Sequence, residues 1–428
     1  MNDKILPQSH ECTYRRECRP AREIGGTAVD HAIRHALAWL VMGNAVGLYL
    51  ALLLLFPSLQ VPPWTYGRWV PVHLNLQLYG WTSLPLIAWL FSLYEIDKTR
   101  HAAWGHAAVW AWSVALATGV LHWLGGITSG KIFLDWKGGS LWALVVAQVI
   151  LWAALALAWH ARRLAWNRMR RTGLFIGLIA LALVPISLVF AASPTVYPPI
   201  DRSTGGPTGS SLLGSTLIVI GLMLLLPRMV APRIRKSRAI ATWIFFALSW
   251  LVFGATEAIG GTHRDAWQIL PMLLLLPWAW LIPRDWKNFD WPEGASVWHR
   301  AMLVWWAVLV LTGVLMFQPG ILDRLKFTQG LVAHTHLAMA GFTTSFCALL
   351  CVLITRRALG GTASVVSWHL ATCAMILTLA ASGWQEGKDF HWMTEAPAWR
   401  TTGFILRAVC GSVMAAVSIH WLLNSNRS

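Results

Sequence analysis

Long apolar runs separated by short polar segments follow one another along almost the whole chain. A run of about 20 apolar residues is long enough to cross the hydrocarbon core of a bilayer as a helix. The runs therefore predict an all-α, polytopic membrane protein built as a twelve-transmembrane-helix bundle. The predicted spans are residues 31–57, 69–94, 104–125, 139–160, 173–192, 210–231, 239–262, 266–283, 298–319, 330–355, 364–384 and 399–423.

The composition agrees with this pattern. Of the 428 residues, 56% are hydrophobic and only 12% are charged, and the mean hydropathy is +0.54. A soluble protein of this length does not have such a composition, whereas a polytopic membrane protein does. Residues 1–29 are polar and show no hydrophobic periodicity. We therefore expect a polar tail at 1–29, followed by one membrane domain at 30–424.

The formal net charge is +16, and the distribution of the basic residues along the chain indicates the membrane topology. Most of the 34 Lys and Arg residues fall in the tail and in alternate loops, as in the run from Arg162 to Arg171. Because positive loops stay on the cytoplasmic side, both termini are expected in the cytoplasm. Nucleic acid is not an expected partner, since no soluble basic domain is present to hold it.

Six cysteines occur in the chain, and none belongs to a CxxCH motif. The sequence therefore predicts no covalently attached c-type heme. Cys12 and Cys18 lie in the polar tail, where a cytoplasmic disulfide is not expected, and the sequence assigns them no role.

Two histidines, His334 and His336, stand near the start of a long apolar run, in VAHTHLAMAGF. On a helix they are about 200° apart, so one helix could ligate two cofactors on opposite sides. A third histidine, His73, lies in GRWVPVHLNLQLYGW at a matching depth in the same predicted leaflet. Ionisable residues inside a membrane are costly and usually functional. These residues predict a bis-imidazole heme held by His73 and one member of the pair.

The alternative is that these histidines lie at the membrane edge and bond only backbone or water. Five other membrane histidines have no partner at the same depth, and we interpret them as structural: His122, His160, His299, His369 and His420. His106 lies on the cytoplasmic flank of the predicted span 104–125, and we interpret it as structural too.

The two histidine stretches carry a family resemblance. GRWVPVHLN and AHTHLAMAGF resemble motifs of subunit I of the heme-copper oxidase superfamily, in particular of the C-type oxidases and their nitric oxide reductase relatives. TSGKIFLDW, and ILRAVCGSV with Arg407, add weaker matches. The resemblance covers essentially the whole chain. It implies twelve helices and a low-spin heme b between His73 and His336.

The same resemblance implies further features of the site and its setting. A second, high-spin heme would sit on His334, facing the helices at 210–231 and 239–262. Arg407 would belong to the heme-binding residues. The chain would lie in a bacterial inner membrane, and its redox partner would be a c-type cytochrome, as a subunit or in the periplasm.

The chain departs from the family where the second metal should be. The three family histidines that bind copper or nonheme iron fall on Pro207, Glu257 and Ala258, and the family tyrosine falls on Leu251. Before His263, these two helices contain no histidine. Without imidazole ligands copper should bind only weakly, so we expect no copper site.

Glu257 is the weak catalytic candidate that this comparison leaves. It could carry protons, bind a metal weakly with His263, or pair with Arg264 or a basic residue of an outer loop, and the ion pair is the leading interpretation. The main hypothesis is a respiratory electron-transfer subunit that kept its heme. The alternatives are an active O2 or NO reductase with an atypical second metal site, and a non-catalytic protein that binds or senses a gas through a His334 heme.

Overall fold

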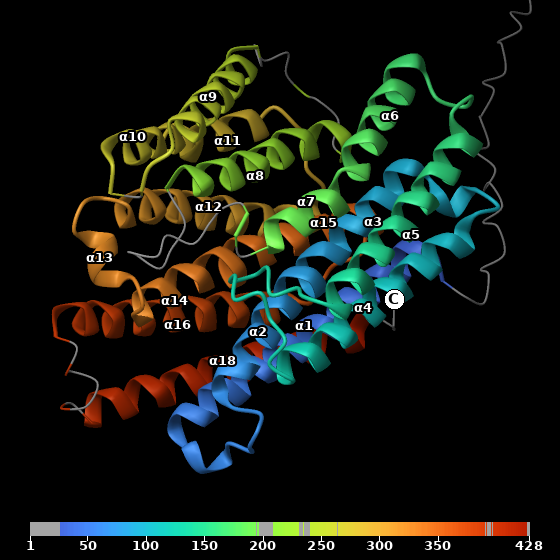
Figure 1. Cartoon of the computed structure of the whole chain (residues 1–428). Coiled ribbons are helices and arrows are strands. Elements are labelled where there is room, and N and C mark those ends of the chain that lie inside the picture. Colours follow the sequence, from blue (N-terminus) through green and yellow to red (C-terminus); the bar gives the residue numbers. More distant parts are fainter. Residues whose placement is uncertain are drawn as a thin grey trace, which may run out of the picture.

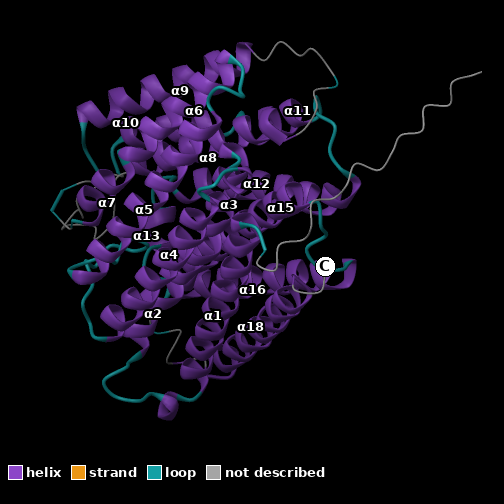
Figure 2. Cartoon of the chain, turned by 90° about the vertical axis from the view of Figure 1, so that its right-hand side faces the viewer, coloured by secondary structure: helices purple, strands orange, loops and turns teal. Residues whose placement is uncertain are grey.

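The computed structural model describes residues 26–193, 195–196, 209–230, 234, 240–262, 264–389, 391, 395 and 397–425. Within these ranges the chain is helical and contains no strand. The helices run roughly side by side in one bundle (Figures 1 and 2). The all-α membrane fold predicted from the sequence is therefore confirmed.

The helices of the first half occupy the predicted apolar runs. The segment at 66–94 consists of two α-helices joined by η2, a stretch with the wider i to i+5 hydrogen-bonding of a π-helix. The bounds are α1 Ala28–Leu55, α2 Tyr66–Asn75, η2 Leu76–Thr82, α3 Ser83–Tyr94, α4 Ala102–Leu124, α5 Gly139–Arg162, α6 Arg168–Ala182, α7 Val184–Ala192 and α8 Gly209–Val230.

The second half repeats this interruption once, at η6, between α14 and α15. Short 3-10 turns also occur, of which η4 (Leu270–Leu275) joins α10 to α11. The bounds are α9 Ile240–Ile259, α10 Ala266–Ile269, α11 Trp278–Trp286, α12 Ser296–Met316, α13 Ile321–Leu325, α14 Gln329–His336, η6 Leu337–Thr343, α15 Thr344–Thr355, α16 Thr362–Lys388 and α18 Pro397–Ser425.

Ten helical segments of the described chain are long and apolar enough to cross a membrane. Two further predicted spans also coincide with helical segments. One is Tyr66–Tyr94, which η2 interrupts. The other is α8, whose apolar part Leu213–Met229 is shorter than the ten spanning segments. A multi-pass membrane protein follows from these segments, and the count of twelve spans stays a prediction.

The core is centred on α15. All residues from Thr344 to Leu353 are buried, as expected for a helix that is apolar on every side. On the outside of the bundle, α1 packs along α18 and α3, and α16 packs against both α14 and α18. This arrangement brings the amino-terminal and carboxy-terminal helices together around α14 and α15 (Figure 1).

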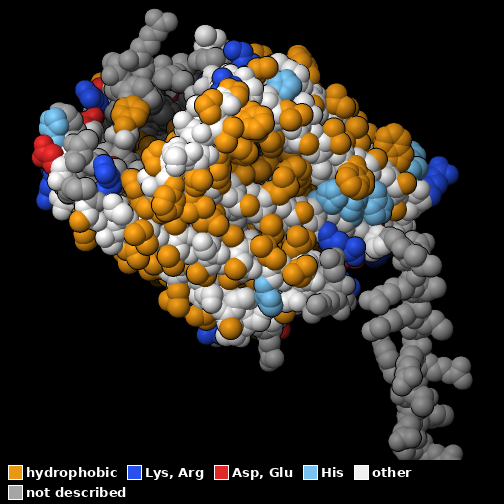
Figure 3. All heavy atoms as spheres, turned by 90° about the horizontal axis from the view of Figure 1, so that it is seen from below, with side chains coloured by type: hydrophobic (Ala, Val, Ile, Leu, Met, Phe, Trp, Pro, Cys, Tyr) orange, Lys and Arg blue, Asp and Glu red, His pale blue; other side chains and the backbone are white. Residues whose placement is uncertain are grey.

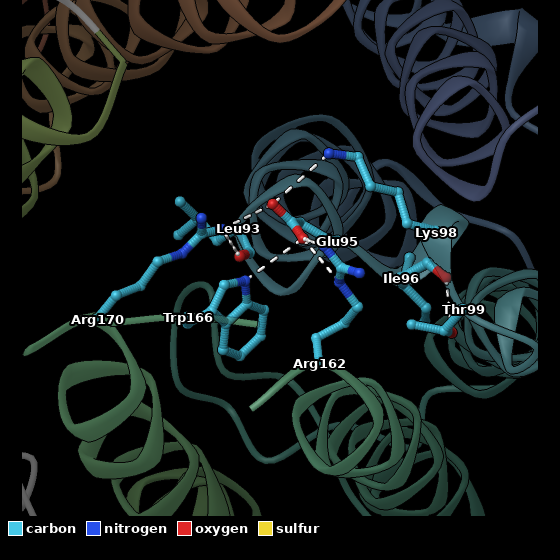
Figure 4. Close-up of polar contacts among 8 residues, drawn as sticks. All are labelled: Leu93, Glu95, Ile96, Lys98, Thr99, Arg162, Trp166 and Arg170. Carbon is cyan, nitrogen blue, oxygen red and sulfur yellow. Dashed lines mark hydrogen bonds and ion pairs between the residues drawn. The ribbon is translucent and has the colours of Figure 1, made fainter. Parts of the chain in front are cut away.

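An ion-pair cluster fixes one end of the bundle, where α3, α5 and α6 meet. Glu95 accepts from Arg162 Nε at 2.9 Å, from Trp166 Nε1 at 3.3 Å and from Arg170 Nη2 at 3.3 Å (Figure 4). Lys98 lies 3.6 Å from the same carboxylate. One acidic side chain thus joins three helices.

Candidate functional site

A cavity lies between α1, α2, α14 and α18, and both His73 and His336 line it. About 780 Å³ of space not filled by atoms lies within it, including its open side. Arg407 and Met339 also line the cavity. The structure therefore brings together three of the residues singled out in the sequence.

The His73 ring has one fixed orientation. Its Nδ1 lies 2.8 Å from the carbonyl oxygen of Gly43 on α1. A carbonyl only accepts, so Nδ1 carries the proton and Nε2 keeps its lone pair. Gly47, one turn further along α1, makes room for the ring, because a Cβ there would lie 2.6 Å from His73 Cε1. His73 is thus prepared to bind through Nε2.

The His336 ring is held in the same way by its own helix. Its Nδ1 lies 2.9 Å from the carbonyl oxygen of Val332, one turn earlier in α14. Nδ1 again donates, and Nε2 is again the free ligand atom. A backbone hydrogen bond on the second ring nitrogen is the usual support for a histidine that binds a metal. Both cavity histidines have this support.

A π-helical stretch follows each of these histidines closely: η2 begins three residues after His73, and η6 directly follows His336. π-helical turns are rare and occur often at functional sites. Trp81 of η2 donates to Thr344 Oγ1 at 3.1 Å and so joins α15 to η2. The two interrupted helices are therefore fixed relative to each other beside the cavity.

Polar groups cluster at the cavity wall. Arg407 of α18 is 8% exposed, and its Nη1 donates to Gln329 Oε1 at 3.1 Å. Gln77 Nε2 donates to Asn44 Oδ1 at 2.9 Å, while Asn44 Nδ2 is buried and has no hydrogen-bond partner among the described residues. A buried donor without a partner is costly, so this amide has hydrogen-bonding capacity left for a ligand.

The loop between α4 and α5 closes one side of the cavity. It contains the TSGKIFLDW stretch, of which Phe133 lines the cavity. Asp135 accepts from Asn75 Nδ2 at 2.9 Å and from Thr128 Oγ1 at 2.7 Å, which ties the loop to α2. Burial raises the pKa of Asp135, and the two hydrogen bonds act against that rise. The loop is thus anchored two residues from His73.

His334 has different neighbours from His336. Its Nδ1 lies 3.4 Å from Thr312 Oγ1, and its Cε1 would meet a Cβ on Gly313 at 3.5 Å. Both contacts are with α12, which the sequence interpretation did not include in this site. The two rings of the pair therefore face different neighbours, as their offset on the helix predicts. Among the described residues, no contact supports the interpretation that His334 faces 210–231 and 239–262, which stays a prediction.

Of the ion pairs expected for Glu257, the one with Arg264 does not form, and a pair with a basic residue of an outer loop stays a prediction. Arg264 instead donates to Asp323 at 3.0 Å. In the part of the chain that the structure describes, Glu257 Oε1 is buried without a hydrogen-bond partner. His263 and Pro207, like Cys12 and Cys18, lie outside the described residues. Among the residues described, no group of three His, Cys, Asp or Glu side chains is arranged to hold a metal ion.

Sequence reasoning missed several supporting residues of the cavity. Gly43 and Val332 act through backbone carbonyls, which no side-chain pattern reveals. Gly47 sits within a predicted span and gave no separate signal. At the end of each π-helical stretch, a threonine hydroxyl donates to the backbone carbonyl five residues earlier. Thr82 Oγ1 donates to Gln77, and Thr344 Oγ1 donates to Met339. These threonines are the sequence signal that could have indicated the stretches.

No family model matches the chain. A cytochrome c oxidase subunit 1 homolog of Agrobacterium tumefaciens (strain T37) is 26% identical over 132 residues, which is 29% of this chain and 23% of that protein. Cytochrome c oxidase subunit 1 of Rhodobacter capsulatus is 21% identical over 88% of this chain and 77% of its own length. The Cbb3-type cytochrome c oxidase subunit CcoN1 of Stutzerimonas stutzeri is 25% identical over 28% of this chain and 26% of that protein.

A solved heme-copper terminal oxidase dimer shares the fold. The superposition has a TM-score of 0.60 at 12% identity and covers 94% of this chain and 84% of that one. Because the sequence identity is so low, this TM-score shows that the two chains share a fold and shows nothing further. The fold and the curated relatives together support a divergent heme-copper oxidase subunit I.

Proposed function

We propose that the chain is a membrane electron-transfer protein of the respiratory type, with a low-spin heme b held by His73 and His336. The observation that carries the proposal is one cavity lined by two histidines, each with Nδ1 bonded to a backbone carbonyl. Two imidazoles with free Nε2 atoms are a ligand set for six-coordinate iron.

The residues of the cavity fit such a group. Heme is a large apolar ring with two carboxylates, and the wall offers the matching chemistry. Met339, Met375 and Met414 supply apolar, adaptable side chains. Arg407 supplies a cation for a carboxylate, and Asn44 Nδ2 supplies a donor without a partner in the described part of the chain.

The bound iron would supply reversible one-electron oxidation and reduction. Around it, Gly43 and Val332 hold the two rings in the tautomer that leaves Nε2 unprotonated. Arg407 would stabilise the negative carboxylates and, as a nearby cation, would favour the reduced state. The apolar side chains of the wall would pack against the ring. These residues set the redox potential and do not themselves react.

Two further parts of the proposal concern metals. Copper is not held, because the family's ligand positions carry Pro207, Glu257 and Ala258 in this sequence. A second heme would take His334 as its ligand. The unpartnered Glu257 carboxylate oxygen favours the alternative of an O2 or NO reductase with an atypical second metal. Copper or nonheme iron in stoichiometric amount would support that alternative.

The setting follows from the same proposal. The chain would lie in a bacterial inner membrane with both termini in the cytoplasm, so that the cavity histidines lie toward the periplasm. A c-type cytochrome, on another subunit or in the periplasm, would then exchange electrons with it. A reporter fused after Ser428 should be active only in the cytoplasm. Activity on the opposite side would place the heme near the wrong face for this partner.

The test is the spectrum of the purified protein. The wild type should show a low-spin bis-histidine signal, and both His73→Ala and His336→Ala should abolish it. His122→Ala is a matched control, because His122 Nδ1 also bonds the carbonyl one turn earlier, that of Thr118 at 2.9 Å, but does not line the cavity. A six-coordinate signal that survives both cavity variants would disprove the ligand assignment.

A further inference from the structure

A second group of histidines lies near the beginning of α1. His31 and His35 are one turn apart and therefore share a face of that helix. His106 reaches the same place from α4. The ring centroids are 4.5 Å apart for His31 and His35, and 5.0 Å apart for His31 and His106. His31 stands twelve residues before Gly43, which is about 18 Å along a helix, so this group is separate from the heme cavity.

The His31 and His106 rings face each other through the same atom. Their Nδ1 atoms lie 3.0 Å apart. Two metal–imidazole bonds of about 2.0–2.1 Å at roughly a right angle would place their nitrogens about 3 Å apart. A right angle between ligands is typical of tetragonal Cu²⁺ and Ni²⁺ sites. The spacing therefore suits such an ion as well as a shared proton.

Neighbouring side chains hold the cluster in place. Ser113 Oγ lies 2.7 Å from His35 Nδ1 and accepts from Trp39 Nε1 at 3.0 Å. Trp110 packs edge-on against His31 and His35, with centroid distances of 5.7 and 4.7 Å. The three imidazoles remain partly exposed. Figure 3 shows histidine side chains gathered in one contiguous surface patch beside hydrophobic ones.

The acidic neighbour is already engaged elsewhere. Asp97, which interacts electrostatically with His106, accepts from the backbone N–H groups of Ala28 at 2.7 Å and of Val29 at 3.4 Å. Since no three ligand side chains converge in the described ranges, the two imidazole nitrogens would be the protein ligands and water would complete the coordination. Such an open, two-histidine site is accessible from the surface.

We propose that His31 and His106 form a surface site for one divalent transition-metal ion of the Cu²⁺ or Ni²⁺ class. Cu²⁺ should bind more tightly than Ni²⁺, because affinities at nitrogen ligands rise in that order along the first transition row. His35 is not a proposed ligand; its ring lies against His31 and its Nδ1 is bonded to Ser113. The site is distinct from the heme ligands and needs no heme to form.

The experiment titrates the purified full chain in detergent with Cu²⁺ and follows binding by calorimetry and electron paramagnetic resonance. The wild type should bind one Cu²⁺ with two-nitrogen coupling. His31→Gln and His106→Gln should each weaken this site by at least about tenfold, because a lost ligand should cost no less than a lost hydrogen-bonding partner of a ligand, which typically costs about 10–100-fold. His160→Gln is the matched control, because His160 is also exposed at a helix end, on α5.

Folding is checked separately by the heme spectrum and the thermal melting temperature, which the glutamine variants should leave unchanged. If His31→Gln and His106→Gln bind Cu²⁺ as the wild type does, the pair only shares a proton and the proposal is overturned. Equal loss of binding in His160→Gln would also overturn it, since the ion would then bind surface histidines without selection.

Discussion

The two sides of the bundle differ sharply in how well they are packed. In the apolar stretch of Gln329–Thr355, beside the cavity, 72% of the residues are buried, whereas in Ile240–Ile259 only 11% are. Side-chain hydrogen bonds join helices on the cavity side, as between Trp81 and Thr344. Of α9, Ser249 and Thr256 are the buried residues within the described chain.

This contrast has a functional meaning under the proposal. The well-packed side holds two rings in fixed orientations, which a six-coordinate iron requires. The sparsely packed side carries the positions where the family would bind its second metal, and there the sequence has Glu257 and Ala258 in place of imidazoles. A helix with so little internal contact is covered by lipid, by another subunit or by a cofactor. The well-packed side is thus the side with the proposed heme ligands, and the sparsely packed side is the side that lacks the family's metal ligands.

The largest effect should come from glycines that test this contrast directly. Gly47→Ala places a Cβ 2.6 Å from His73 Cε1, whereas a Cβ on Gly254 of α9 meets no atom of the described residues within 4 Å. Alanine favours a helix over glycine by about 1 kcal/mol at both positions, so propensity cannot explain a loss. We expect Gly47→Ala to lose the low-spin heme and Gly254→Ala to keep it, measured as heme per chain. Equal heme content in both would contradict the role assigned to Gly47.

The next largest effect should come from His334. It tests whether the sparsely packed side also binds a cofactor. The wild type should contain two hemes per chain and should bind CO when reduced, because a five-coordinate iron on His334 has a vacant position. His334→Ala should lose one heme and all CO sensitivity while the low-spin spectrum survives. A wild type with one heme and no CO shift would refute the second heme and, with it, the gas-binding alternative.

Removing the cavity cation should have a moderate effect. Arg407→Gln takes a positive charge from the cavity wall, and the reduced state loses its stabilisation. We expect the midpoint potential to fall by about 60 mV, which for one electron corresponds to about 1.4 kcal/mol. Potentiometric titration of the low-spin heme measures the change. Arg300→Gln, at an exposed position of α12, is the control and should leave the potential unchanged.

The sequence predicted the fold well because hydrophobic runs of spanning length leave few alternatives. It also brought His73 and His336 to one site, since these were recognisable as costly groups at matching depth, whereas Arg407 was assigned to that site only by the family resemblance. It could not predict the carbonyls of Gly43 and Val332, because backbone acceptors depend on packing. The two seven-residue π-helical stretches, η2 and η6, were missed for the same reason.

The histidine cluster was missed for a different reason. His31 and His35 stand four residues apart in HAIRH, which was a readable signal of a shared helix face. The sequence interpretation of His106 as structural considers only its place on the cytoplasmic flank of the span 104–125. Only the packing of α1 against α4 places it 3.0 Å from His31. Contacts between helices that are distant along the chain are what the apolar pattern leaves open.

The smallest effect should come from the ion-pair cluster at Glu95, which lies away from both sides of the comparison. Burial raises the pKa of Glu95, but hydrogen bonds from Arg162 and Trp166 and the charges of Lys98 and Arg170 outweigh this, so the pKa lies below its ordinary value of 4.5. A carboxylate with a lowered pKa stabilises the folded state above pH 4.5, and this contribution disappears as the pH falls through the folded pKa.

Glu95→Gln should therefore lower the melting temperature by about 2 °C or less at pH 7, since partly exposed ion pairs contribute about 1 kcal/mol or less. The difference from the wild type should stay constant from pH 8 to about pH 5 and shrink below pH 4.5. Differential scanning fluorimetry across this range measures it, with Asp290→Asn, at an exposed position, as the control. A difference that grows as the pH falls would show that burial, rather than the ion pairs, dominates at Glu95.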